Sequence, residues 1–144
     1  MDERKDAMKR SYVAGLTALC LALSAVVAVA EDKAAKAYPD IAIKDLKAAI
    51  EKKQVTVIDV NGTDSYQEGH IPTAINFEAA EKDLAKVLPK DKDALIVAYC
   101  GGPQCQAYQA AAKKAVAMGY TNVKHLSAGI SGWKGAGEKT EKAG

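Results

Sequence analysis

The sequence is poor in arginine and has no large excess of charge of either sign. Both arginines, Arg4 and Arg10, stand close to the start of the chain. The rest of the chain therefore has no guanidinium group to hold a phosphate or another oxyanion with two parallel hydrogen bonds. The whole sequence carries a formal net charge of only +2. This balance gives no electrostatic basis for binding nucleic acid.

Cysteine and histidine are scarce as well. The chain has three cysteines, Cys20, Cys100 and Cys105, and two histidines, His70 and His125. The last two cysteines and the histidines do not stand at the spacings that are typical of zinc sites. We therefore expect no bound metal ion.

Long apolar stretches are limited to one, near the start of the chain. The uncharged run Ser11–Ala30 follows Lys9 and Arg10 and ends in the small-residue pattern Ala28-Val29-Ala30. This arrangement predicts a secretory signal peptide over residues 1–30 and a mature protein that is periplasmic or secreted. An uncleaved membrane anchor is the alternative. The two cysteines of the mature protein would then lie in an oxidising compartment.

Strand patterns alternate with helix patterns after residue 40. The clearest strand is Val55–Val60, a nearly continuous β-branched run of the kind that parallel sheets bury on both faces. The alternation predicts an α/β fold with a central, mostly parallel sheet of about five strands flanked by helices. We expect strands at 41–43, 55–60, 74–77, 95–99 and 121–126, and helices at 44–53, 78–88, 104–118 and just after 129. One domain would span 41–134, between a flexible segment at 31–40 and a disordered tail at 135–144.

Cys100 stands where one of these strands gives way to a loop. Leu95–Tyr99 precedes it, Gly101-Gly102-Pro103 breaks the strand, and a helix-favouring sequence begins at Gln104. Backbone amides at a helix start lack partners within the helix and favour an anion, so they lower the pKa of a nearby thiol. This position favours a reactive thiolate over an inert buried cysteine.

A second strand end points to the same place. The run Val55–Val60 ends at Asn61-Gly62. In parallel α/β sheets, ligands bind beyond the carboxyl ends of the strands. We expect Asn61 to lie beside the Cys100 loop, and Asp59 to order the loops by hydrogen bonding.

Three segments together resemble the rhodanese-like sulfurtransferase family. They are Ile58-Asp59-Val60 with Tyr66–Asn76, then Tyr99–Cys105, and finally Gly119–Val123 with Leu126–Gly129 and Trp133. The resemblance implies a three-layer α/β fold. It also implies transfer of a sulfane sulfur, from thiosulfate, polysulfide or a protein persulfide, to a thiol or cyanide acceptor.

The resemblance assigns roles to the loop. Cys100 would be the nucleophile that carries the sulfur as a persulfide. The substrate would be bound by backbone amides of Gly101, Gly102, Gln104, Cys105 and Gln106, with Asn61 beside them. No metal or organic cofactor is needed. The implied partners are a small sulfur donor and a thiol or cyanide acceptor, or a protein thiol, with no nucleic acid, and with a membrane contacted only through an uncleaved leader.

Three positions depart from the family pattern. Asn61 stands where many members have arginine, Cys105 where many have a basic residue, and Thr73 where the family has glycine. Without arginine, an anionic donor such as thiosulfate loses its bidentate partner, so a less charged donor or a protein persulfide fits better. A related Cys-loop phosphatase is disfavoured for the same reason, since Gln106 takes the place of an arginine.

Cys105 leaves two interpretations open. It could form a reversible disulfide with Cys100, and as a resolving thiol it could attack the Cys100 persulfide and release the sulfur. Alternatively, it begins the helix and points into the core. The competing functions are therefore a thiol–disulfide redox or sulfur-relay protein and a non-catalytic binding module of the same fold.

The two histidines are expected to be structural. His70 could act as a general base, but a structural role in the loop is the favoured interpretation. His125 lies on an expected strand among apolar residues. We expect it in the core or at the sheet edge.

Overall fold

The computed structural model describes residues 38–144. The predicted signal peptide and most of the segment 31–40 lie outside the described residues.

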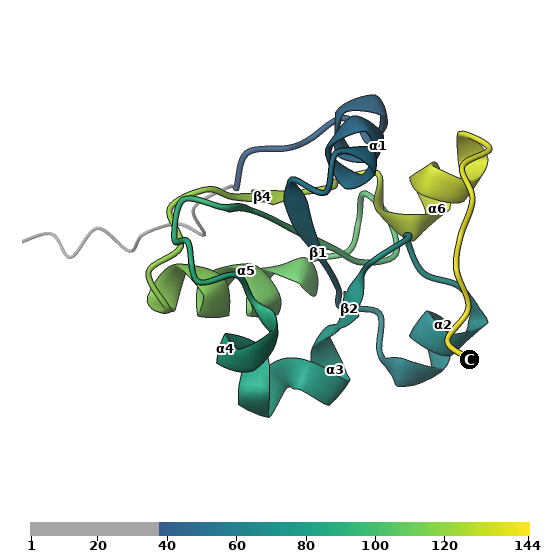
Figure 1. Cartoon of the computed structure of the whole chain (residues 1–144). Coiled ribbons are helices and arrows are strands. Elements are labelled where there is room, and N and C mark those ends of the chain that lie inside the picture. Colours follow the sequence, from purple (N-terminus) through teal and green to yellow (C-terminus); the bar gives the residue numbers. More distant parts are fainter. Residues whose placement is uncertain (1–37) are drawn as a thin grey trace, which may run out of the picture. The chain divides into compact units, whose positions relative to one another are not determined.

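A parallel sheet of four strands forms the centre of the domain (Figure 1). The strands are β1 (Val55–Asp59), β2 (Ile75–Asn76), β3 (Leu95–Tyr99) and β4 (Val123–His125), in the order β2-β1-β3-β4. The predicted parallel α/β sheet is confirmed. The expected strand at 41–43 is reduced to an isolated bridge between Asp40 and His125, because a helix already begins at Ile43.

Helices cover both faces of the sheet and complete three layers (Figure 1). On one face lie α1 (Ile43–Glu51) and α6 (Gly129–Gly135), and on the other lie α3 (Phe77–Ala80), α4 (Leu84–Val87) and α5 (Tyr108–Ala117). The remaining helix, α2 (Thr63–Glu68), follows β1.

The core consists of two parts, one on each face of the sheet, because side chains alternate along the strands. In β3, Ile96 and Ala98 pack with α5, whereas Val97 and Tyr99 pack with α1 and α6. Successive residues of a strand point to opposite faces, so an unbroken apolar strand serves two cores. This double burial fixes the carboxyl ends of β1 and β3, whose register pairs Asp59 with Tyr99.

Two predicted helices differ from the structure. The helix expected at 78–88 is interrupted, since a 3₁₀ turn at Glu81–Asp83 separates α3 from α4. The helix expected from Gln104 begins only at Tyr108. The reason is local: the Cys105 amide donates to the Gly102 carbonyl at 3.0 Å and closes a turn, which keeps this part of the chain out of the helix.

Both chain ends of the described part are held against the domain, where their polar composition predicts flexibility and disorder. The Pro39 carbonyl accepts a hydrogen bond from the His125 amide at 3.0 Å. In the tail, Glu141 forms an antiparallel bridge with His70, and the Trp133 indole donates to the Lys139 carbonyl at 2.8 Å. Composition does not reveal such single contacts, and the flexible segment 31–40 and the disordered tail 135–144 remain predictions.

Candidate active site

The site begins where β1 and β3 end. The Tyr99 hydroxyl donates to Asp59 Oδ2 at 2.5 Å, and the Asn61 amide donates to Asp59 Oδ1 at 2.8 Å. The Ile71 amide donates to the Tyr99 hydroxyl oxygen at 3.0 Å. Burial, together with the neighbouring Asp59, holds the pKa of Tyr99 well above its ordinary value, so its hydroxyl remains a donor. Asp59 therefore lies where the sequence places it, tying the end of β1 to the end of β3.

Helix α6 holds the loop that follows β3. The amides of Ile130 and Ser131 donate to the carbonyls of Cys100 and Gly101 at 2.9 and 3.0 Å. Gly129 has φ +59°, and a Cβ there would lie 2.5 Å from the Gly102 nitrogen. Only glycine permits this approach, because an added side-chain atom would collide with loop backbone.

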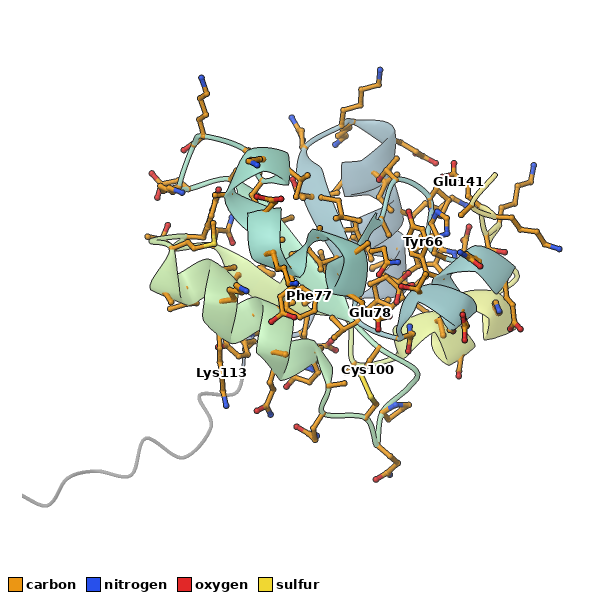
Figure 2. All side chains as sticks on the ribbon, turned by 90° about the horizontal axis from the view of Figure 1, so that it is seen from below. Tyr66, Phe77, Glu78, Cys100, Lys113 and Glu141 are labelled. Carbon is orange, nitrogen blue, oxygen red and sulfur yellow. A yellow bond between two sulfur atoms is a disulfide. The ribbon has the colours of Figure 1, made fainter. Side chains whose placement is uncertain are left out.

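Cys100 and Cys105 are joined in a disulfide (Figure 2). Their Cα atoms are 6.3 Å apart, within the range that disulfides normally span. Cys100 is buried and Cys105 is half-buried. The structure thus answers the question that the sequence left open: Cys105 is not the start of the helix, and its sulfur bonds to that of Cys100.

The loop amides divide into two groups. The Cys105 amide is engaged by the Gly102 carbonyl, so it is not free to bind a substrate as predicted. Within residues 38–144, the amides of Gly101, Gly102, Gln104 and Gln106 donate to no protein acceptor. Unpaired amides gathered in one short loop favour an anion.

Asn61 lies against this loop. Its Oδ1 is 3.7 Å from the position that a Cβ on Gly101 would take. Its Nδ2 is buried and has no hydrogen-bond partner among the residues that the structure describes. A buried donor without a partner is costly. Asn61 is not among the residues that line the cavity at the cysteines.

A small cavity of about 40 Å³ lies at the disulfide. Its lining residues are Cys100, Gly102, Pro103, Cys105, Gln106, Tyr108, His125, Leu126 and Ser127. A space of this size admits a water molecule or a single sulfur atom rather than a large ligand.

His125 is the site residue that sequence reasoning missed. It lies on the edge strand β4, as expected, but its place in the wall of the cavity beside both cysteines was not predicted. Its ring stacks on that of Tyr108, with centroids 4.3 Å apart, and its Nδ1 lies 2.9 Å from the Tyr38 carbonyl oxygen. A signal was available: His125 is the last residue of β4, and the carboxyl ends of parallel strands share one edge.

His70, in contrast, does not line this cavity. Its ring stacks on Tyr66 at 3.7 Å, its Nδ1 lies 2.8 Å from the Tyr66 carbonyl oxygen, and its backbone pairs with Glu141. Figure 2 shows Tyr66 and Glu141 together, apart from Cys100. These contacts fit the structural role that the sequence favours.

A larger cavity lies away from the cysteines. It measures about 430 Å³ and is lined by Lys47, Ile50, Glu51, Pro72, Trp133, Gly137, Glu138 and Lys139. It contains no nucleophilic thiol, so we place the chemistry at the smaller cavity. Within residues 38–144 there is also no cluster of metal-binding side chains and no helix suited to crossing a bilayer.

Comparisons with known proteins agree with this geometry. The model of the rhodanese-like domain matches residues 42–136. The chain is 28% identical over 98 residues to the thiosulfate sulfurtransferase GlpE of Coxiella burnetii, covering 67% of this chain and 88% of that enzyme. The solution structure of the rhodanese-like domain of Alr3790 from Anabaena sp. superposes with a TM-score of 0.59 at 26% identity, covering 73% of this chain and 80% of that one.

One relative is a longer protein of another kind. The chain is 42% identical over 88 residues to the HTH-type transcriptional regulator Rv0324 of Mycobacterium tuberculosis. The alignment covers 60% of this chain but only 38% of the regulator. The chain thus spans little more than a third of that relative.

Proposed function

The chain belongs to the rhodanese-like family, and from this membership we propose that it is a sulfurtransferase that carries a sulfane sulfur as a persulfide on Cys100. The observation that carries the proposal is the position of Cys100 at the carboxyl end of β3, in a loop where four amides have no protein acceptor within residues 38–144. Such amides stabilise the negative charge of a thiolate before the reaction and of a persulfide after it.

The reaction requires two displacements on sulfur. The Cys100 thiolate attacks the sulfane sulfur of the donor, the donor S–S bond breaks, and the electron pair of that bond leaves with sulfite or a thiolate. A thiol or cyanide acceptor then attacks the outer sulfur of the persulfide and returns the Cys100 thiolate. Since Cys100 is held in a disulfide here, a dithiol reductant must open that bond first.

The donor that we favour is polysulfide or a protein persulfide rather than thiosulfate. Asn61, which follows β1, lies against the loop at Gly101, and the described residues contain no arginine. An amide offers thiosulfate one neutral donor in place of a bidentate charged one. We place this activity outside the cytoplasm, on the basis of the leader-like sequence at 1–30 and the cysteine pair.

The disulfide favours a second candidate function, a sulfur relay that uses both cysteines. With a sulfur on Cys100, the Cys105 thiol can attack Cys100 Sγ, form the observed disulfide and release hydrosulfide. A dithiol would then return both cysteines to thiols. The protein would in this way convert sulfane sulfur to sulfide at the expense of a dithiol.

Intact-mass measurement separates these functions. The reduced protein, freed of reductant, is treated with polysulfide, and Cys100→Ala and Cys105→Ser variants are treated in parallel. A sulfurtransferase gains one sulfur atom in the wild type and in Cys105→Ser, loses it to cyanide as thiocyanate, and gains none in Cys100→Ala.

The outcomes are distinct. In a relay, wild type passes from the persulfide to the disulfide with release of sulfide, whereas Cys105→Ser keeps its persulfide. If Cys100 gains no sulfur in any reduced form of the protein, the proposed function is wrong, and a binding module remains.

A further inference from the structure

We propose that His125 carries the proton from the Cys105 thiol to the departing sulfur when Cys105 attacks the Cys100 persulfide and the disulfide forms. The inference rests on the proposed function. It adds to it a residue that neither the family motifs nor the loop sequence singles out.

The placement of His125 is the first support. It lines the same cavity of about 40 Å³ as Cys100 and Cys105, although it comes from β4 and not from the loop. Tyr108, at the start of α5, stacks on one face of its ring with planes only 8° apart. The ring is therefore held in one orientation at the wall of a space just large enough for one sulfur atom.

The hydrogen bond of His125 defines which nitrogen is available. Nδ1 lies 2.9 Å from the Tyr38 carbonyl oxygen, which can only accept, so Nδ1 must hold the proton. In the neutral ring Nε2 then has a lone pair. Within residues 38–144 it makes no hydrogen bond. His125 is thus built to take up a proton at Nε2 and give it back.

The relay step needs such a carrier. The persulfide begins as Cys100–S–S⁻ and Cys105 begins as a thiol. Nε2 accepts the Cys105 proton, and the resulting thiolate attacks Cys100 Sγ. The persulfide S–S bond breaks, its electron pair stays with the outer sulfur, and the proton from Nε2 joins that sulfur. Hydrosulfide leaves, both cysteines are oxidised to the disulfide, and His125 is neutral again.

Among residues 38–144, few other groups that titrate surround His125. They are the phenols of Tyr38 and Tyr108, the carboxyl of Asp40 across the isolated bridge, and the two cysteines. Asp40 is occupied, since its oxygens accept from the amide and hydroxyl of Ser127 at 2.8 and 2.9 Å. The neighbouring Lys124 points to the other side of the strand, as alternation requires.

His125→Asn tests the proposal, because an asparagine amide can replace Nδ1 as the donor to Tyr38 but has no basic nitrogen. Reduced protein is loaded with polysulfide, and the rates of sulfide release and disulfide formation are followed between pH 6 and pH 8. At pH 6.5 we expect disulfide formation to slow by about a hundredfold, which is the lower end of the rate enhancement that general acid–base catalysis provides. The variant rate should then rise about tenfold per pH unit as free thiolate appears, while the wild-type profile is flatter.

His70→Asn is the matched control. His70 has the same arrangement, a ring stacked on tyrosine with Nδ1 at a carbonyl oxygen, but it does not line the cavity. Its closure rate and pH profile should equal those of the wild type. Added imidazole should restore closure in His125→Ala, and that variant also serves if His125→Asn does not fold.

The failures are distinguishable. If Cys100 gains a persulfide and His125→Asn closes at the wild-type rate with the wild-type pH profile, this inference is wrong and the proposed function stands. If no variant gains a persulfide on Cys100, including Cys105→Ser, the proposed function fails and this inference with it.

Discussion

Asn61 places a neutral amide beside the loop, where a site for an anionic donor would use a positively charged side chain. Its Oδ1 approaches the loop at Gly101, and its Nδ2 is buried without a partner among residues 38–144. A neutral amide can donate one hydrogen bond to a bound sulfur or oxygen, but it adds no positive charge. The selectivity of the loop for its donor should therefore depend on this side chain.

Asn61→Arg should improve the use of thiosulfate. A charged hydrogen bond contributes about 1.5–3 kcal/mol, so we expect KM for thiosulfate to fall by roughly tenfold or more. This KM is measured from the rate of thiocyanate formation in the presence of cyanide. An uncharged organic trisulfide is the control donor, and its KM should not fall. Equal changes with both donors would contradict the electrostatic explanation.

Single residues also show how far sequence reasoning reaches. Asp59 was expected to order the loops because it ends a strand beside the site, and its bonds to Tyr99 and Asn61 do so. Its chief partner could not be foreseen, because Tyr99 is separated from it by a full crossover and meets it only through the register of β1 with β3. His125 could have been found, because it ends β4 at the edge where the carboxyl ends of the parallel strands meet.

At the scale of elements, the start of α6 positions the reactive loop. Two of its amides bind loop carbonyls, and Gly129 lets the backbones meet. The helix thus uses its unpaired amides to hold the loop rather than to bind an anion directly.

Gly129→Ala should displace the loop. The new Cβ would lie 2.5 Å from the Gly102 nitrogen, at a φ of +59° that alanine seldom adopts. We expect a loss of about 2–4 kcal/mol in the free energy of unfolding and slower loading of Cys100 with sulfur. Gly135→Ala is the matched control in the same helix, since no atom of the described residues lies within 4 Å of its Cβ position. Similar effects of both substitutions would contradict the proposed role of the Gly129 contact.

A second element, α2, depends on a carboxylate from α3. Glu78 Oε2 accepts from the amide and the hydroxyl of Thr63 at 2.7 and 2.8 Å, at the start of α2. The bond from the Thr63 amide, and then that from its hydroxyl, lowers the pKa of Glu78 from its usual 4.5. The ionised form is therefore the one that stabilises the fold. That stabilisation is present above the unfolded pKa and is lost as pH falls through the folded pKa.

Glu78→Gln should consequently lower Tm at neutral pH, and the difference from wild type should shrink as pH falls below about 4.5. Thermal unfolding between pH 3 and pH 7 measures it. In a protein that already carries Thr63→Ala, Glu78→Gln should lower Tm by less, because one of the two donors to Glu78 is gone. A difference in Tm that stays constant across this pH range would refute the assignment.

The start of α5 shows why element boundaries were harder to predict than elements. The composition after Gln104 favours a helix, and a helix does follow, but only from Tyr108. Local propensity could not include the bond between Cys100 and Cys105 or the turn that it accompanies. A tertiary constraint of this kind overrides propensity at the end of a helix, where few backbone bonds are lost.

At the scale of the whole molecule, the parallel sheet followed from the sequence because its strands are apolar on both faces. The contacts of the tail with the domain could not be predicted in this way, because they are few and polar. The tail nevertheless joins segments far apart in the chain. Glu138 forms a salt bridge with Lys47 of α1 at 2.8 Å. The Lys139 carbonyl accepts a hydrogen bond from the Trp133 indole, and Glu141 forms a backbone bridge with His70.

Removal of residues 138–144 should therefore destabilise the domain without disabling its chemistry. The backbone amides of His70 and Glu141 each donate to the carbonyl of the other residue at 2.9 Å. The indole of buried Trp133 would also be left without its acceptor, the Lys139 carbonyl. Together these losses amount to about 2 kcal/mol, or roughly 10 °C in Tm for a domain of this size.

Loading of Cys100 should proceed as in the full chain, because none of the deleted residues lines the cavity at the cysteines. Lys47→Ala is the control, since it removes only an exposed ion pair and should leave Tm nearly unchanged. An unchanged Tm in the truncated protein would mean that the tail adds nothing to the fold. A stable truncated protein that no longer accepts sulfur would instead mean that the tail acts on the loop, through α6 and its contacts with Cys100 and Gly101.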